Sequence, residues 1–227
     1  MPGVKLIALV ARRHDLDLAA FSHHWRTTHR DLILRLVKTG IIKGYVQNHR
    51  TEPQLDGLPV VADGSPELWI ESIEDMARIR QSSEYMEGAY LDEPNFMEGR
   101  SRILVAEEVV VVDGAGQERA AKHLKLMLFF RRAATCTAGA LNASYESLSR
   151  PLLMAAGMPV RLTQQRPIAN ASAVPTRPIY DLAEFSWWPD RASLAAAWID
   201  RQYPEVIDPA ATCGVLVHEE PCLWPVG

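Results

Sequence analysis

The sequence predicts an α+β protein built from two consecutive βαββαβ units. Two observations support this prediction. Apolar runs, amphipathic segments and turn-forming residues follow one another in that order within residues 1–113. Residue types then recur at a nearly constant spacing, so that Lys5 returns as Lys125 and Arg12 returns as Arg132. A repeated spacing of this kind is typical of a duplicated unit.

The first expected strand, residues 5–12, is a short apolar run of the length that strands usually have. Because side chains alternate along a strand, its apolar residues face both sides: Ile7 and Leu9 on one, and Ala8 and Val10 on the other. A strand of this kind must be covered by a layer on each face.

An amphipathic helix should follow, because Asp15 and Asp17 suit its N-terminus and Gly40 suits its C-terminus. A second helix should begin at Ser72, which with Asp75 resembles a capping box. The other strands of the first unit are expected at residues 41–50, 67–71 and 103–112. The resulting order, βαββαβ, is the ferredoxin-like pattern.

Residues 114–122 are expected to link a first unit, residues 1–113, to a second unit, residues 123–227. Helices cover one face of a four-stranded sheet, and the other apolar face needs a partner. We therefore expect the two sheets to pack against each other as an intramolecular pseudo-dimeric α+β barrel. A ligand would then sit in the space between the sheets.

The composition of the chain limits the kinds of molecule that it can bind. A net charge of -4 without a basic stripe argues against nucleic-acid binding. The apolar run near the N-terminus is too short to cross a bilayer and lacks signal-peptide features, so we predict a cytoplasmic protein with no membrane association. Cys136, Cys213 and Cys222 form no CxxC pair and should be reduced.

The expected first helix carries an unusual cluster of aromatic and titratable side chains. Its apolar stripe passes through Phe21 and Trp25, with His29 close to the stripe and His24 on its flank. Two interpretations of His29 stay open: a core histidine bonded to a backbone carbonyl, or a general acid or base near neutral pH. His24 and His29 are five residues apart, about 140° around an α-helix, which is poor geometry for a shared metal ion.

The second expected strand presents Tyr45, Gln47 and His49 on one face. These side chains either converge on a substrate that carries oxygen atoms, or His49 simply meets solvent at the end of the strand. Trp69, in the third strand, is expected to form a wall in either case.

Comparison of the two units favours a single site in the first. At the repeat spacing, His24, Trp25 and His29 correspond to Ser144, Tyr145 and Ser149, and His49 corresponds to Arg166. Groups needed for folding should persist in both units, whereas groups needed for one site need persist only once. The alternative is a divergent second pocket lined by Tyr145, Gln164 and Trp187.

Several of these features together resemble the EthD family of dimeric α+β barrels: Phe21, His24-Trp25, His29, residues 45–49, residues 67–69, residues 83–85, Phe96 and Glu107-Glu108. The resemblance covers residues 4–112 well and extends weakly to residues 124–224. It implies a fused duplication with a degenerate second copy. The wider superfamily includes monooxygenases, cyclases, dehydratases, decarboxylases, isomerases and haem enzymes, so the resemblance indicates the fold better than the reaction.

We expect an enzyme that performs cofactor-independent acid–base chemistry on a hydrophobic or aromatic carbonyl compound, as a dehydratase, decarboxylase, cyclase or isomerase. Neither a GxxxxGK[ST] nor an HExxH motif occurs, and no cofactor or metal is predicted, with haem as the lesser alternative. A monooxygenase-type reaction and a non-catalytic ligand-binding role are the alternatives, and association into a homodimer is left open. The candidate catalytic residues are His29, His24, Tyr45 and His49, and the candidate substrate-binding residues are Trp25, Gln47 and Trp69.

Overall fold

The computed structural model describes residues 3–114, 116–145, 158–168, 179–199 and 205–225. The protein has a mixed α+β fold, as the sequence predicts. The first half contains, in order, β1 (Val4–Leu9), α1 (Leu18–His24), the π-helical turn η1 (Trp25–His29), α2 (Arg30–Val37), β2 (Gly44–Arg50), β3 (Gly64–Ile70), α3 (Asp75–Gln81), the π-helical turn η2 (Tyr85–Ala89), α4 (Tyr90–Phe96) and β4 (Arg102–Asp113).

The expected linker, residues 114–122, contains the short helix α5 (Gln117–Ala120). The second half then contains β5 (Leu124–Arg132), α6 (Ala138–Ser144), β6 (Arg161–Pro167), β7 (Leu182–Trp188), α8 (Arg191–Ile199) and β8 (Ile207–Leu223). Within the described part of the chain, no helix combines the length and apolar character needed to cross a membrane.

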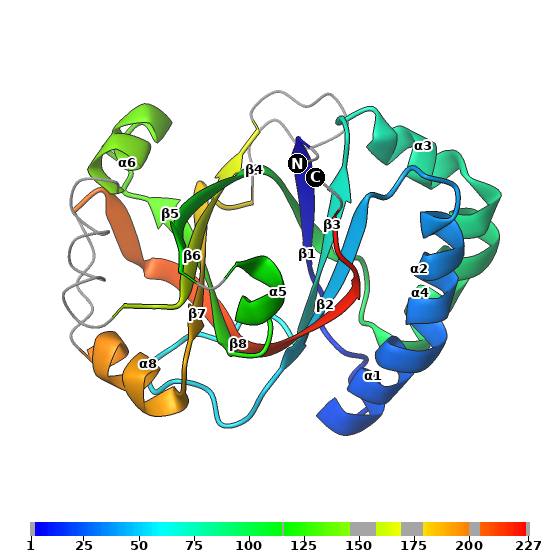
Figure 1. Cartoon of the computed structure of the whole chain (residues 1–227), viewed down its shortest axis with the longest axis horizontal. Helices are drawn as coiled ribbons and strands as arrows, with labels where there is room; N and C mark the ends of the chain where they lie inside the picture. The colour runs from blue at the N-terminus through cyan, green and yellow to red at the C-terminus, as the bar shows by residue number, and fades with distance from the viewer. Residues whose placement is uncertain (1–2, 115, 146–157, 169–178, 200–204, 226–227) are drawn as a thin grey trace.

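The eight strands form one closed barrel in the order β1-β3-β2-β8-β5-β7-β6-β4. All neighbouring strands are antiparallel, and the two halves join edge to edge where β4 pairs with β6 and β2 pairs with β8. Helices α1 to α4 cover one flank of the barrel, and α6 and α8 cover the opposite flank (Figure 1). Every strand therefore has a neighbour on both sides, which leaves no unpaired sheet edge in the barrel.

Strand β1 shows how the two faces are used. Ile7 and Leu9 pack inside the barrel with Met127 and Phe129 of the other half. Leu6 faces outward and packs with residues of the covering helices. The alternation expected from the sequence thus separates a shared interior from a helix-covered outer face.

The barrel interior also holds a cluster of buried charges from both halves. Lys5 forms ion pairs with Glu67 and Glu108, and its Nζ lies 2.6 Å from Oε2 of Glu67. Lys125 forms ion pairs with Glu67 and Glu219, the latter at 2.8 Å. Because the burial of unpaired charge is costly, these pairings constrain how the halves fit together.

Neutral polar groups complete this cluster. The Asn48 amide donates to Glu67 at 2.9 Å, and the Trp187 indole N–H donates to Glu219 at 2.7 Å. Charges and large side chains therefore fill the space between the two sheets. The expectation of a ligand in that space is wrong, and the cavity described below lies on the outer face of the first-half sheet.

The first helix of the chain begins as expected, since Asp17 caps α1 by accepting a hydrogen bond from the Ala20 backbone N–H at 2.7 Å. Its middle departs from α-helical geometry at η1, where the N–H of Arg30 reaches the carbonyl of Trp25, five residues earlier. The Trp25 ring rests against Gly64 of β3, where a Cβ would overlap the ring. A residue without a side chain thus lets the helix approach the sheet.

We predict that Gly64→Ala destabilises the protein by about 1–3 kcal/mol, because the new methyl group must displace the buried Trp25 ring. Gly139→Ala is the matched control, because a Cβ at that helical position meets nothing within 4 Å and should be neutral or slightly stabilising. Urea denaturation measures both variants. Equal stability of Gly64→Ala and wild type would contradict the close packing.

The interior charges predict a dependence of stability on pH. Burial alone would raise the pKa of Glu67, but Lys125 and Lys5 lower it to about 2, below its ordinary value of 4.5. A carboxyl whose pKa is lowered by folding stabilises the protein above its unfolded pKa, and this contribution is lost as the pH falls from about 4.5 towards 2.

We therefore expect Glu67→Gln to lower the free energy of unfolding at neutral pH by about 3 kcal/mol, because it leaves buried lysine charge without its partner. The loss of stability with acid should also be shallower in this variant than in wild type. Glu71→Gln, at an exposed carboxylate paired with Lys43, is the control and should change stability by less than about 0.5 kcal/mol. Denaturation measured across the acid range tests both expectations.

Candidate functional site

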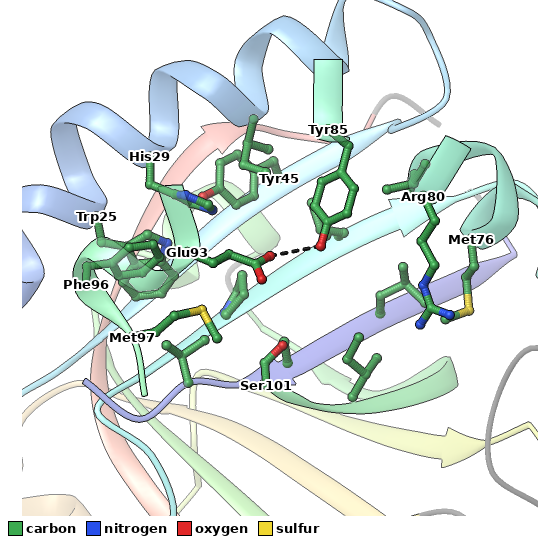
Figure 2. Close-up of a pocket in the computed structure, with 18 residues that line it drawn as sticks. Trp25, His29, Tyr45, Met76, Arg80, Tyr85, Glu93, Phe96, Met97 and Ser101 are labelled. Atoms are coloured by element: carbon green, nitrogen blue, oxygen red, sulfur yellow. Dashed lines mark hydrogen bonds between the residues drawn. The ribbon is translucent and has the colours of Figure 1, made fainter. Parts of the chain in front are cut away.

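A cavity of about 120 Å³ lies between the outer face of strands β1 to β4 and the helices that cover them (Figure 2). Most of its wall is apolar, and twelve side chains provide this surface: Leu6, Ala8, Val10, Trp25, Ile33, Pro66, Leu68, Met76, Ile79, Phe96, Met97 and Ile103. A cavity with mostly apolar walls and a few polar groups is the usual form of a small-molecule site.

Polar groups enter this cavity from several elements. His29 comes from η1, Tyr45 from β2, Tyr85 from η2 and Glu93 from α4. Figure 2 shows the His29 ring and the Glu93 carboxylate approaching the same space, with Arg80 on the far side. The cavity therefore offers proton donors and acceptors next to apolar surface.

His29 is oriented by a carboxylate. Its Nδ1 lies 3.0 Å from Oδ2 of Asp92, and Nε2 of His24 lies 2.9 Å from Oδ1 of the same residue. Asn95 also donates to Asp92, at 3.0 Å. The Asp92 carboxylate thus holds two histidine rings that come from one helix.

The π-helical turn explains why both histidines reach Asp92. Five residues span about 140° of an α-helix, but a π-helical turn pairs residues five apart. Since η1 runs from Trp25 to His29, it brings the His29 ring round to the side of His24. The two histidines therefore share a carboxylate, whereas the expectation from the sequence concerned only a shared metal ion.

Asp92 is ionised at neutral pH. Burial raises its pKa, but hydrogen bonds from His29, Asn95 and His24 lower it to a net value of about 2. When Nδ1–H of His29 donates to this carboxylate, Nε2 is the nitrogen left with a lone pair. The ring lines the cavity, and its face packs against Phe96 at 4.7 Å between centroids.

Glu93 follows Asp92 in the chain but points into the cavity. The Tyr85 hydroxyl donates to its Oε1 at 2.8 Å. Burial raises the pKa of Glu93, and the Tyr85 hydrogen bond and the charge of a protonated His29 offset only part of this rise. The adjacent carboxyl groups therefore have different environments, which lower the pKa of Asp92 and raise that of Glu93.

Tyr45, Gln47 and His49 share the outer face of β2 and form a chain of hydrogen bonds. Gln47 donates to the Tyr45 hydroxyl at 2.7 Å and to the Trp25 carbonyl at 3.0 Å, and the His49 Nε2 lies 3.1 Å from Oε1 of Gln47. Tyr45 lines the cavity, whereas Gln47 and His49 lie beside it, under the helix. Burial raises the pKa of Tyr45, so its phenol is neutral.

His49 is buried and packs against Trp25, with ring centroids 4.6 Å apart. Burial and the nearby charges of Arg26 and His218 lower its pKa to about 3. The ring is therefore neutral at physiological pH. The interpretation in which His49 meets solvent at the end of the strand is wrong.

The two candidate tryptophans lie on opposite faces of the sheet. Trp25 lines the cavity, as the sequence suggests. Trp69 lies inside the barrel, where the Lys5 ammonium is 4.4 Å from its ring centroid. The alternation of β3 places Trp69 on the face opposite to Leu68, which does line the cavity.

In the second half, the side chains at the positions that correspond to the cavity are arranged differently. Tyr145 packs outside the barrel against Phe130, whereas Trp187 lies inside, bonded to Glu219. The side chains proposed for a divergent second pocket thus lie on different faces of the sheet. Ser149, the counterpart of His29, lies outside the described residues.

Sequence reasoning missed Asp92 and Glu93, which lie well beyond the expected start of the second helix at Ser72. The structure forms η2 and α4 there, with Pro94 inside the helix. Two consecutive acids before this proline were the available signal. Their opposite orientations could not be read from the sequence, because the preceding π-helical turn sets the phase of the helix.

Comparisons with known proteins agree with this architecture. Residues 13–100 match the model of the EthD domain. Comparison with curated proteins gives no significant sequence match. Among solved structures, an anthrone oxidase-like protein superposes with a TM-score of 0.59 at 7% identity, covering 100% of this chain and 96% of that one.

Two further solved structures have similar folds. A mutant chlorite dismutase from Candidatus Nitrospira defluvii has a TM-score of 0.55 at 11% identity, covering 94% of this chain and 90% of its own. A candidate monooxygenase from Lactobacillus acidophilus NCFM has a TM-score of 0.51 at 7% identity, covering 96% and 93% respectively. At such identities the likeness is one of fold alone. Residues 13–100 therefore match the EthD domain, and the chain shares the fold of these solved structures.

Proposed function

We propose that this protein is an enzyme that uses His29 for proton transfer on a small hydrophobic or aromatic carbonyl compound. One observation carries the proposal: Nδ1 of His29 lies 3.0 Å from the ionised Asp92, while its ring lines an apolar cavity. A carboxylate that binds one ring nitrogen fixes the tautomer and supports the charge that the ring gains when the other nitrogen takes a proton.

In this mechanism His29 removes a proton from a carbon next to the carbonyl group. Tyr45 accepts a hydrogen bond from Gln47, so its own hydroxyl proton can be donated to the substrate oxygen, on which negative charge develops. His24 and Gln47 act as positioning residues, the first through Asp92 and the second through Tyr45. His49 supports Trp25 from behind, and Trp25 contacts the substrate.

The volume of the cavity limits the ligand. A cavity of about 150 Å³ holds one benzene molecule, and this cavity measures about 120 Å³. The volume therefore limits the ligand to about one small ring. A haem group, which is several times larger than benzene, does not fit this cavity, so we route no step through haem.

The names of the structural neighbours include an oxidase-like protein and a monooxygenase, so a cofactor-independent oxygenation is the enzymatic alternative. Those likenesses concern the fold, and the proposal of acid–base chemistry rests instead on the His29–Asp92 pair. Oxygen dependence separates the two reactions.

We also propose that the chain is a fused pair of ferredoxin-like units in which only the first retains a site. The strand registers support this origin, because Lys5 pairs with Trp69 in the first half and Lys125 pairs with Trp187 in the second. Each lysine lies over its tryptophan, at 4.4 Å and 4.6 Å from the ring centroid.

The catalytic role of His29 can be tested with cyclohexanone in D₂O, by following deuterium uptake at the carbons next to its carbonyl by NMR. We expect wild type to accelerate this exchange and His29→Gln to lower the rate by about 10²–10⁴-fold, the usual contribution of a positioned base. Asp92→Asn should lower it at least about tenfold, because the amide no longer supports the imidazolium charge.

His23→Gln is the matched control, because His23 is exposed on the same helix. This variant should exchange deuterium at the wild-type rate. Exchange that survives in folded His29→Gln would show that His29 is not the base.

Acid–base chemistry predicts independence from oxygen. Wild-type exchange with cyclohexanone should proceed at the same rate in air and under nitrogen, since no electron leaves the substrate. Oxygen consumption, measured with an electrode alongside NMR, should stay at the level of a protein-free sample. Substrate oxidation that stops under nitrogen would favour the oxygenase alternative instead.

A further inference from the structure

We propose that Glu93 is a second catalytic residue, which donates a proton to a leaving hydroxyl group, so that the enzyme removes water from β-hydroxy carbonyl compounds of about one ring in size. This inference rests on the proposed function of His29 and narrows its reaction class. It assigns a role to a carboxyl group that proton abstraction by His29 leaves unused.

The placement of Glu93 supports this role. Its carboxyl group enters the cavity from α4, while its neighbour Asp92 turns away to hold His24 and His29. Successive helical residues point about 100° apart, so one helical turn can supply both a positioning carboxylate and a group that faces the ligand. Asp92 can therefore support the base of the elimination while Glu93 supplies its acid.

The partners of Glu93 suit an acid. The Tyr85 hydroxyl donates to Oε1 at 2.8 Å, which fixes the carboxyl group and leaves Oε2 for the ligand. Burial raises the pKa of Glu93, the Asp92 charge raises it further, and the Tyr85 hydrogen bond, His29 and Arg100 lower it by less. More of this carboxyl is protonated near neutral pH than is usual for glutamate.

The position of Glu93 relative to His29 also suits the role of an acid. The charge of His29 acts on Glu93, and both side chains line one small cavity, so a ligand of one ring can contact both groups at once. A reaction that removes a proton at one carbon and a hydroxyl at the next needs a base and an acid that reach the same ligand. Decarboxylation, by contrast, needs only one proton donor.

The elimination conserves atoms and electrons. The C–H bond next to the carbonyl breaks, and its proton moves to Nε2 of His29. The electron pair of that bond forms the new C=C bond, and the bond from the adjacent carbon to the hydroxyl group breaks. Glu93 gives its proton to the departing oxygen, which leaves as water. Return of the proton from His29 to Glu93 through solvent restores the enzyme.

The probe is 3-hydroxycyclohexanone, and two rates are followed by NMR in D₂O: deuterium exchange next to the carbonyl, and formation of 2-cyclohexenone. Exchange reports the step of His29, and enone formation adds the step of Glu93. We expect wild type to accelerate both. Glu93→Gln should keep exchange within about threefold and lower enone formation at least about 100-fold.

Glu87→Gln is the matched control, because Glu87 is an exposed carboxylate on the neighbouring turn η2. It should leave both rates unchanged. His29→Gln should lose exchange and enone formation together. Thermal denaturation of each variant separates a chemical effect from loss of the fold.

The outcomes distinguish the two proposals. If Glu93→Gln forms enone as fast as wild type, or if wild type exchanges deuterium without forming enone, Glu93 is not the acid and the role of His29 stands. If wild type catalyses neither step, or if His29→Gln retains both, the proposed function fails as well.

Discussion

The buried ion cluster inside the barrel is the constraint on which the rest of the structure depends. Lys125 of the second half binds Glu67 of the first and Glu219 of its own half, while Lys5 binds Glu67 and Glu108. Charges removed from water are tolerated only when they are paired. The Lys125–Glu67 pair joins the two halves, so the charges favour the closed barrel.

Because the interior is filled, the space for a ligand is displaced to the outer face of the sheet. The cavity forms where Leu6 and Leu68 face the covering helices rather than the other half. The same alternation that sends Trp69 inward to Lys5 sends Leu68 outward to the cavity. The core and the site therefore use opposite faces of the same strands.

Two π-helical turns shape the site. The turn η1 brings His24 and His29 to a single carboxylate, and η2 lies next to the helix that supplies it. Asp92 and Glu93 lie in different environments, since one is held ionised by histidines and the other is bonded to Tyr85 in the apolar cavity. Insertions of this kind in a helix often occur at functional sites.

The sequence by itself determined the α+β class, the positions of the strands and the place of His29 near the buried face of its helix, because alternation and amphipathic spacing are local properties. It also placed Tyr45, Gln47 and His49 on one strand face. Only the tertiary structure decided that Trp69 faces the interior and that Asp92 and Glu93 join the site. Barrel closure fixes which face of each strand is inside, and the π-helical turns shift the helical phase, so neither result follows from spacing along the chain.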